Sequence, residues 1–270
     1  MIISEIKIKN FGPFRELKEF KVGSINLIEG DNGSGKTCFI EAIRWCLTGI
    51  IGPDRHPDFP YSADDNSSVE LILKDGKKLY KIKRSSKSII HPNKFIPNVI
   101  ANFMFVGENL SSQVFMKDLD NIKRNEELFD ILFKDPIKRK AHEKILNSYL
   151  PQNKHGDLGK DPKIKINYKD RSIEALQDSF NMGSGDIDHY QICLYLGIYS
   201  ILIKERFVFP LFFDSTFSCM DNLVRVEASK AFRSCLAQMF FIANPSDLSF
   251  CPILREADNV IKLKRKIENE

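Results

Sequence analysis

The sequence predicts an α/β fold in two lobes, and three observations lead to this prediction. Residues 30–37 read GDNGSGKT, a complete G-x-x-x-x-G-K-[ST] phosphate loop. The first 105 residues otherwise read as mostly β, with one helix. After residue 185, helical patterns alternate with apolar extended runs, as they do in a parallel sheet covered by helices.

The phosphate loop stands in the context that gives this pattern its meaning. Residues 24–29 read as a buried strand and residues 38–47 as a helix, so the loop joins a strand to a helix N-terminus. Its glycines let successive backbone N–H groups face a phosphate, beside the positive end of the helix dipole. We expect Lys36 to reach the β- and γ-phosphates and the Thr37 hydroxyl to hold Mg²⁺. The predicted nucleotide contacts are Asn32, Gly33, Ser34, Gly35, Lys36, Thr37 and Cys38.

The remaining elements follow from periodicity and turn signals. Alternating runs predict strands at 2–8, 17–22, 24–29, 67–74, 77–84 and 101–106. The dipeptide Asp75-Gly76 predicts a hairpin turn. Residues 50–66 read as a surface loop, 109–150 as one or two short helices interrupted at Pro136, and 151–163 as a loop. Beyond them we expect helices at 185–204 and 222–238 and strands at 207–213, 239–243 and 258–264.

A second group of residues fits phosphate chemistry. Residues 207–214 form an apolar strand that ends in Asp214. A carboxylate at the tip of a dry strand beside a phosphate loop can hold Mg²⁺. We therefore predict a metal site made by Thr37 and Asp214, although Asp214 as a turn or cap residue remains the simpler alternative.

Bulk properties exclude some classes of protein. The composition, 43% hydrophobic and 28% charged, is that of a globular protein, and the net charge of +4 permits nucleic-acid contact without arguing for it. No apolar run reaches the roughly 18 residues that a membrane span needs, and residues 1–9 lack the plan of a signal peptide. We expect a cytoplasmic location. The six cysteines form no C-x-x-C pair, so they predict small core residues and no zinc site.

Six motifs in order resemble one family. The chain resembles the ATPase heads of the SMC family and its relatives: the repair ATPases with coiled-coil arms, the RecF type, and the DndD-type ATPase of DNA phosphorothioation. The matching segments are residues 10–14 (NFGPF), 32–37 with 41–43 (NGSGKT and EAI), 103–108 (FMFVGE), 181–186 (NMGSGD), 210–214 (PLFFD) and 218–221 (SCMD). This resemblance implies an ABC-type P-loop NTPase head that binds ATP.

Within that resemblance, the later motifs imply further site residues. Residues 103–108 stand where relatives carry a Mg-contacting Gln, so Glu108 is expected on the γ-phosphate side. Residues 181–186 resemble the signature motif, in which Gly183, Ser184 and Gly185 would meet the nucleotide of a partner subunit. Residues 218–221 resemble the D-loop.

The departures from the family concern hydrolysis. A Glu usually follows the Walker B Asp and polarises the attacking water, but here that position is Ser215. The switch His falls near Asn244, which can orient a γ-phosphate but cannot carry a proton. The signature Ser is replaced by Gly183, with Ser184 next to it. The predicted catalytic residues are Glu108, Ser215 and Asn244, and turnover is expected to be slow.

The largest departure is the missing arm. Relatives insert hundreds of residues of coiled coil between the Gln loop and the signature, whereas only 74 residues separate Glu108 from Gly183. We therefore predict an N-terminal mixed β lobe with the phosphate loop at 1–108, a short helical insert at 109–165, and a C-terminal parallel α/β lobe at 166–270.

The sequence leaves two questions open. Residues 77–94 hold seven Lys or Arg and no acid, which fits either a DNA contact or a solvated hairpin face. The resemblance implies an ATP-driven switch that forms a homodimer, or a heterodimer with a related ATPase, and gates a protein effector in DNA repair, DNA modification or antiphage defence. The alternative is a regulatory module that binds ATP without turning it over. A small-molecule phosphotransferase leaves residues 183–186 and 218–221 unexplained.

Overall fold

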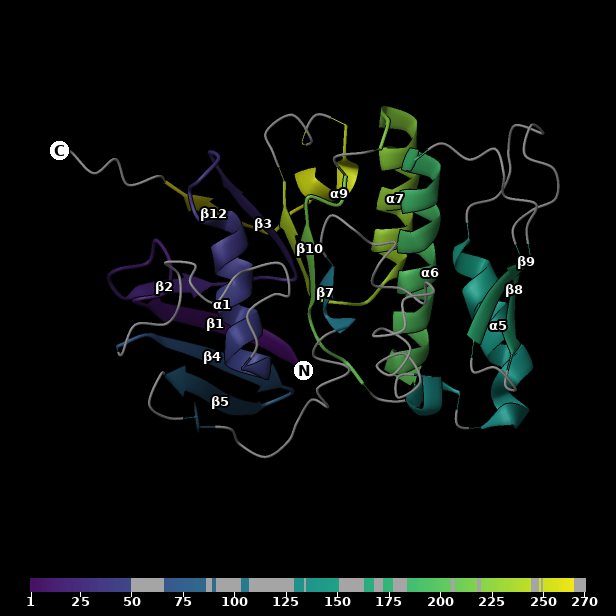
Figure 1. Cartoon of the computed structure of the whole chain (residues 1–270), viewed down its shortest axis with the longest axis horizontal. Coiled ribbons are helices and arrows are strands. Elements are labelled where there is room, and N and C mark those ends of the chain that lie inside the picture. The colour runs from purple at the N-terminus through teal and green to yellow at the C-terminus, as the bar shows by residue number, and fades with distance from the viewer. Residues whose placement is uncertain are drawn as a thin grey trace.

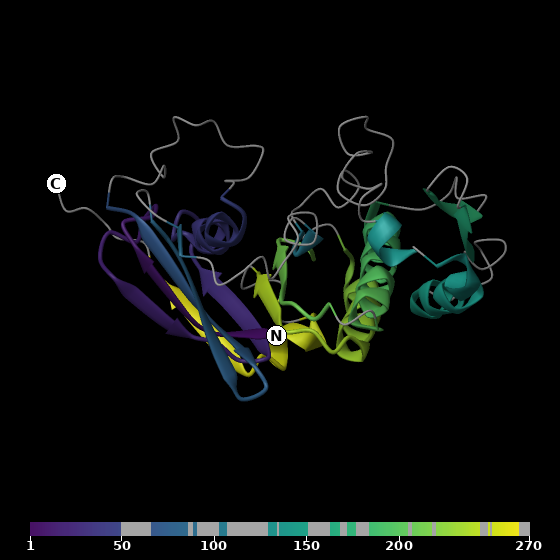
Figure 2. The same cartoon turned by 90° about the horizontal axis from the view of Figure 1, so that it is seen from below.

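The computed structural model describes residues 1–49, 66–85, 89–90, 103–106, 129–133, 135–150, 163–167, 172–176, 184–204, 207–217, 220–243, 248 and 250–264. These residues form two five-stranded sheets, one two-stranded hairpin and the helices that pack on them (Figure 1). The first sheet lies at one end of the molecule and the hairpin at the other (Figures 1 and 2).

The first sheet is antiparallel, in the order β2-β1-β4-β5-β6. Its strands are β1 (Ile2–Lys9), β2 (Lys18–Lys21), β4 (Ser68–Asp75), β5 (Lys78–Ser85) and β6 (Ile89–Ile90). The register places Ile6 opposite Leu71 and Leu71 opposite Ile82, all fully buried on the inner face. The outer face carries charged side chains, so the alternation of these strands is that of a sheet covered on one side.

The second sheet is parallel throughout, in the order β12-β3-β11-β10-β7. Its strands are β3 (Ile25–Gly30), β7 (Phe105–Val106), β10 (Leu211–Asp214), β11 (Met239–Ile242) and β12 (Asn259–Leu263). The Phe212 ring stacks on Phe105 at 4.6 Å and on Phe240 at 4.7 Å between centroids. Continuous apolar runs are what strands covered on both faces require.

Helices cover the two sheets and build the outer part of the second lobe. They are α1 (Lys36–Thr48), the 3₁₀ turn η1 (Pro136–Lys138), α5 (Arg139–Tyr149), α6 (Ser184–Lys204), α7 (Asn222–Ser234) and α9 (Pro252–Arg255). Helix α6 lies between α7 and α5, and α5 also contacts the hairpin of β8 (Lys163–Asn167) and β9 (Ser172–Leu176) (Figure 1). Along the described part of the chain, no helix combines the length and the apolar content that a membrane span needs.

A buried amide joins the two sheets. The Nε2 atom of Gln238, just before β11, donates to the carbonyls of Ile3 and Gly23 at 2.7 Å each. Its Oε1 atom accepts from the Ile3 N–H, also at 2.7 Å. Gln238 is 4% exposed, so its three hydrogen bonds lie away from water and tie β1 of the antiparallel sheet to the amino end of the parallel one.

The predicted fold class is confirmed, and the structure refines its parts. The division at residues 108 and 165 stays a prediction, but the parallel sheet takes β3 and β7 from the first segment and three strands from the third. Strand β10 begins at Leu211, later than expected, and α7 ends at Ser234, earlier than expected. The hairpin β8–β9 and helix α9 were missed, although the alternating residues of β8 (KIKIN) carry a strand signal.

Candidate nucleotide-binding site

The candidate site lies at the carboxyl edge of the parallel sheet. The phosphate loop follows β3, and Asp214 ends β10; β11 lies between these two strands. The register aligns Asp214 with Ile242, and Ile242 with Ile28. Two strand spacings amount to roughly 10 Å, so the Asp214 carboxylate is within reach of a metal ion bound to a phosphate on the loop.

The phosphate loop has the backbone geometry of an anion cradle. Gly33 and Gly35 have φ of 79° and 98°, a left-handed conformation that glycine adopts without steric cost. The Ser34 N–H donates to the Asp31 carbonyl at 3.0 Å, which closes the turn. Gly35 caps α1, and the first N–H groups of this helix, which begins at Lys36, face the loop. Such N–H groups bind phosphate well.

Two glycines of the loop are enclosed by neighbouring chain. A Cβ atom on Gly30 would lie 2.4 Å from the Leu263 carbonyl oxygen and 2.5 Å from Ser34 Oγ. A Cβ on Gly35 would lie 2.4 Å from Cγ of Pro13. Strand β12 and Pro13 therefore pack against the loop. This packing fixes the shape of the loop in the absence of a ligand.

Two side chains in the loop suit an anion. The Lys36 ammonium donates to the Gly30 and Asp31 carbonyls, at 2.6 and 3.1 Å, and so stays beside the cradle. Ser34 is 3% exposed, and among the described residues its hydroxyl has no hydrogen-bond partner. A cation and an unsatisfied buried hydroxyl beside converging N–H groups fit the phosphates of a nucleotide.

The strand-end acid is accompanied by an unusual serine. Ser215 has φ of 53°, a conformation that non-glycine residues seldom adopt. Its N–H donates to the Ile242 carbonyl at 3.3 Å, and its hydroxyl donates to Asp214 Oδ1 at 3.1 Å. The backbone is thus held to β11, and the side chain at position 215 points back to the carboxylate. Thr37 and Asp214 could hold Mg²⁺ here, while Ser215 offers a hydroxyl where a base would stand.

The other predicted site residues are only partly covered by the structure. Glu108, Gly183 and Asn244 lie outside the described residues. Ser184 and Gly185 form the first turn of α6. Cys38 is buried in the core, so its side chain packs inward from α1. The assignments of all these residues stay predictions.

An aromatic cluster supports the start of α1. Phe11 and Phe14 exchange two backbone hydrogen bonds, and Gly12 between them has φ of 57°. The Phe11 ring lies 5.6 Å from Trp45, and the Phe14 ring lies 6.4 Å from Phe39, both on α1. This turn presents Pro13 to the loop. The sequence contains Gly12-Pro13, a dipeptide that indicates a turn. That Pro13 lies against Gly35 is visible only in the structure.

The Cys46 thiol and the Tyr195 phenol are buried groups of the core. Burial raises the pKa of the Cys46 thiol to about 12, and its Sγ donates to the Val69 carbonyl at 3.3 Å. Burial also raises the pKa of Tyr195, whose hydroxyl donates to the Phe103 carbonyl at 2.5 Å. These groups stay protonated at neutral pH and serve the core, as we expected of the cysteines.

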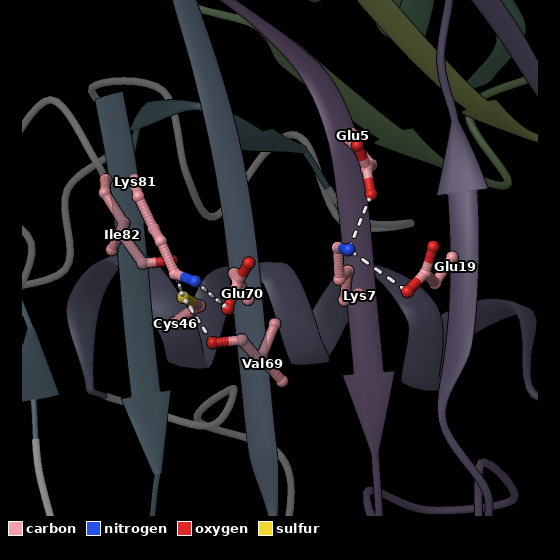
Figure 3. A network of polar contacts seen from close by, with 8 residues as sticks. All are labelled: Glu5, Lys7, Glu19, Cys46, Val69, Glu70, Lys81 and Ile82. Carbon is pink, nitrogen blue, oxygen red and sulfur yellow. Dashed lines mark hydrogen bonds and ion pairs between the residues drawn. The ribbon is translucent and has the colours of Figure 1, made fainter. Parts of the chain in front are cut away.

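Part of the basic stretch is paired on the outer face of the antiparallel sheet (Figure 3). Lys81 lies 2.7 Å from Glu70. Next to it, Lys7 lies 3.0 Å from Glu5 and 3.1 Å from Glu19. Glu70 on the neighbouring strand β4 thus offsets Lys81, while Glu5 on β1 and Glu19 on β2 offset Lys7, which favours the solvated-face interpretation for these residues.

Comparison with known proteins adds a family. A family model described as an AAA domain matches residues 5–184. Among curated relatives, the DNA double-strand break repair Rad50 ATPase of Thermoplasma acidophilum is 30% identical over 211 residues, which cover 76% of this chain and 22% of the relative. The chain therefore spans about a fifth of that relative's length.

Solved structures with the same fold include two ATPase heads. An Smc head bound to the C-terminal winged-helix domain of ScpA matches with a TM-score of 0.66 and 12% identity, over 97% of this chain and 94% of that chain. The recombination mediator RecF in its ATP form matches with a TM-score of 0.61 and 13% identity, over 97% of both chains.

Proposed function

Because this chain belongs to the AAA domain family and has the fold of the SMC and RecF heads, we propose that it binds ATP with Mg²⁺ at the carboxyl edge of the parallel sheet and hydrolyses it slowly. One observation carries this proposal: a complete phosphate loop lies two strands away from the Asp214 carboxylate, at the same edge of one parallel sheet.

The residues of the loop have separate tasks in binding. The N–H groups of Gly33 and Gly35 would bind the phosphate oxygens, because the left-handed conformation of these glycines turns them to one side. Lys36 would leave the carbonyls of Gly30 and Asp31 for the β- and γ-phosphates. Mg²⁺ would supply charge neutralisation at the phosphates, held by the hydroxyl of Thr37 and the carboxylate of Asp214.

Slow hydrolysis follows from position 215. A neutral hydroxyl does not accept a proton from water at pH 7, and the Ser215 hydroxyl already donates to Asp214. The loss of a general base typically costs 10²–10⁴-fold in rate. Glu108 and Asn244 are the residues that we propose to orient the water and the γ-phosphate in its place.

Dimerisation around the nucleotide completes the proposal. The start of α6, with Gly183, Ser184 and Gly185, would meet the γ-phosphate bound by a second head, either another copy or a related ATPase. Helix α6 is 21 residues long, so its first N–H groups carry the full dipole of a long helix.

For the biology, we propose a cytoplasmic switch that gates a protein effector in DNA repair, DNA modification or antiphage defence. The names of the relatives support the link to DNA repair. Direct contact with DNA stays an open part of this proposal, since the described basic face is paired with acids.

The second candidate is an ATP-binding scaffold that does not turn its ligand over. The observation that favours it is that position 215 carries a hydroxyl and not a carboxylate that could act as a base. This hydroxyl donates to Asp214. It shares the binding site with the first candidate and differs only in turnover.

Binding, turnover and association together test these alternatives. Calorimetry with ATP and Mg²⁺ should show binding, and phosphate release should be measurable but below about 10 s⁻¹, the median enzyme rate. Light scattering with a non-hydrolysable ATP analogue should show a dimer that Gly185→Arg blocks while ATP binding persists. Binding without any phosphate release would favour the scaffold, and absence of ATP binding would contradict both.

A further inference from the structure

Two tyrosines of α6 form hydrogen bonds with backbone groups beside the parallel sheet. The Tyr195 hydroxyl donates to the Phe103 carbonyl at 2.5 Å, just before β7 begins. The Tyr199 hydroxyl donates to the Phe209 carbonyl at 2.6 Å and accepts from the Phe209 N–H at 3.3 Å, just before β10 begins. Both tyrosines are buried. Because phenylalanine would fill the same space, each hydroxyl adds its hydrogen bonds and little else.

Tyr195 lies between the segment that leads into β7 and the strand that carries Asp214. Its ring stacks on Phe103 with 4.4 Å between centroids, and it lies 5.9 Å from the Phe213 ring at nearly a right angle. Phe213 directly precedes Asp214 on β10 and pairs with Val106 of β7. Because β7 is only two residues long and stands at the end of its sheet, the contacts of Tyr195 help to hold it against β10.

The two tyrosines also define the direction of α6. The Tyr199 ring lies 5.0 Å from Phe209, and the Tyr195 ring lies beside Phe213, so α6 runs antiparallel to β10. Ser184, the first residue of α6, precedes Tyr195 by eleven residues, or about 16 Å along the helix axis. The first turn of α6 therefore extends beyond the carboxyl end of β10.

A helix that extends this far past its last contact with the sheet magnifies any tilt. A tilt of about 10° at Tyr195 would move the first turn of α6 by about 3 Å over that length. A misplacement of 1 Å in a reacting complex can cost roughly a hundredfold in rate. Tyr195 fixes the helix where it passes the strand end, whereas Tyr199 holds it at the amino end of β10.

The phosphate loop of the same head lies on the other face of the sheet. The Arg44 guanidinium of α1 lies 5.7 Å from the Phe105 ring, which stacks on Phe212. Tyr195 lies beside Phe213, and successive side chains of a strand point to opposite faces. A change at Tyr195 should therefore leave ATP binding by the same head intact.

We propose that Tyr195 is a positioning residue that holds the first turn of α6 in place relative to Asp214, and that this placement lets the turn meet the nucleotide of a second head. The inference rests on the proposed function, in which Ser184 and Gly185 approach the γ-phosphate bound by that head. Without the hydroxyl, the ring at position 195 still fills the core. The helix is then free to tilt, and its first turn occupies the required place only part of the time.

The test compares Tyr195→Phe with Tyr199→Phe, a matched control one turn along the same helix. The control loses two buried hydrogen bonds where Tyr195→Phe loses one, so a pure stability effect would be at least as large in the control. We expect Tyr195→Phe to lower the turnover rate at saturating ATP about tenfold, and to weaken the dimer formed with a non-hydrolysable ATP analogue. Its dissociation constant for ATP, measured by calorimetry, should stay within about twofold of wild type. Tyr199→Phe should lower the melting temperature at least as far as Tyr195→Phe and leave turnover and dimer unchanged.

The outcomes separate this inference from the proposed function. Unchanged turnover and dimer in Tyr195→Phe, or equal losses in both variants, would overturn the inference and leave the proposed function standing. A loss of ATP affinity in Tyr195→Phe would show a merely structural role and overturn the inference too. If the wild-type protein binds ATP without turnover, the dimer alone is the readout. A wild-type protein that neither turns over ATP nor joins a second head would overturn the proposed function and this inference with it.

Discussion

The two sheets of this molecule differ in which parts of them are exposed to solvent. The inner strands β3, β11 and β10 of the parallel sheet are largely buried on both faces, whereas its edge strand β12 exposes Val260 and Lys262. At the ends of the inner strands, β3 and β10 bring the phosphate loop and Asp214 together. The antiparallel sheet exposes one whole face, on which lysines alternate with acids (Figure 3). At a strand end the backbone fixes each residue in one place, whereas on an open face many arrangements of charge serve equally well.

The difference appears in the packing around single atoms. At the strand ends, a Cβ on Gly30 or Gly35 would come within 2.5 Å of a neighbouring atom. On the open face, the Lys7 side chain is partly exposed, and the pKa of its ammonium is raised by hydrogen bonds to Glu5 and Glu19. Exposed pairs of this kind are worth little. Substitutions should therefore cost much at the edge and little on the face.

The largest effect is expected for Lys36→Ala. Two charge-assisted hydrogen bonds to phosphate, at about 2 kcal/mol each, correspond to roughly a thousandfold loss of ATP affinity. Calorimetry with ATP and Mg²⁺ measures it. Lys262→Ala is the matched control: this lysine lies on the neighbouring strand, pairs with Glu29 at 3.1 Å and should leave the affinity within about twofold. Equal losses in both variants would contradict the assignment of the loop.

Next comes Gln238→Ala, which should destabilise the junction between the two sheets. It leaves the N–H and carbonyl of Ile3 and the carbonyl of Gly23 without their buried partner. At about 1–3 kcal/mol for an unsatisfied buried group, we expect a loss of about 3 kcal/mol in urea unfolding. Asn259→Ala removes an exposed bond to the Lys21 carbonyl at the same junction and a bond to Asn26 Oδ1, which still accepts from the Gly23 N–H, so it should cost about 1 kcal/mol or less. A Gln238 variant as stable as wild type would show that the sheets hold together without this amide.

A smaller effect is expected for Asp214→Asn. The amide keeps the shape but loses the charge that Mg²⁺ prefers, so ATP affinity should fall about tenfold with Mg²⁺ present, or about 1.4 kcal/mol, and stay unchanged with the metal chelated. Asp75→Asn, in the exposed β4–β5 turn, is the control. An equal loss of ATP affinity in the presence of chelator would show that Asp214 supports the fold of the site and does not bind the metal.

The smallest effect is expected on the open face. Lys81→Met removes the ion pair with Glu70, in which the Lys81 side chain is 53% exposed. The change in the free energy of unfolding should be less than about 1 kcal/mol. A double-mutant cycle with Glu70→Gln, at low and high salt, isolates the pair. A coupling energy as large as the loss of about 3 kcal/mol expected for Gln238→Ala would contradict the distinction between the strand ends and the open face.

The sequence predicted the elements whose local signals are strong. The loop at 30–37 carries its own glycines and lysine, and β4 and β5 flank a clear Asp-Gly turn. It could not indicate that β3 pairs with β11 and β12, because these partners lie more than 200 residues away. The contact of Pro13 with Gly35 and that of Arg225 with Met220 depend on tertiary packing and side-chain direction, which no periodicity encodes.

The position of β3 between β11 and β12 also sets the order in which the molecule can fold. The phosphate loop directly follows β3, but the two strands that enclose β3 lie at residues 239–242 and 259–263. At about 5–20 residues per second, a ribosome needs roughly 10–50 s to synthesise the chain between them. During that time the antiparallel hairpin of β4 and β5 can form from local contacts. The phosphate loop cannot complete its packing until β11 and β12 have been synthesised. The phosphate loop is thus translated well before the strands that enclose it, and the nucleotide site is complete only after β12 has been made.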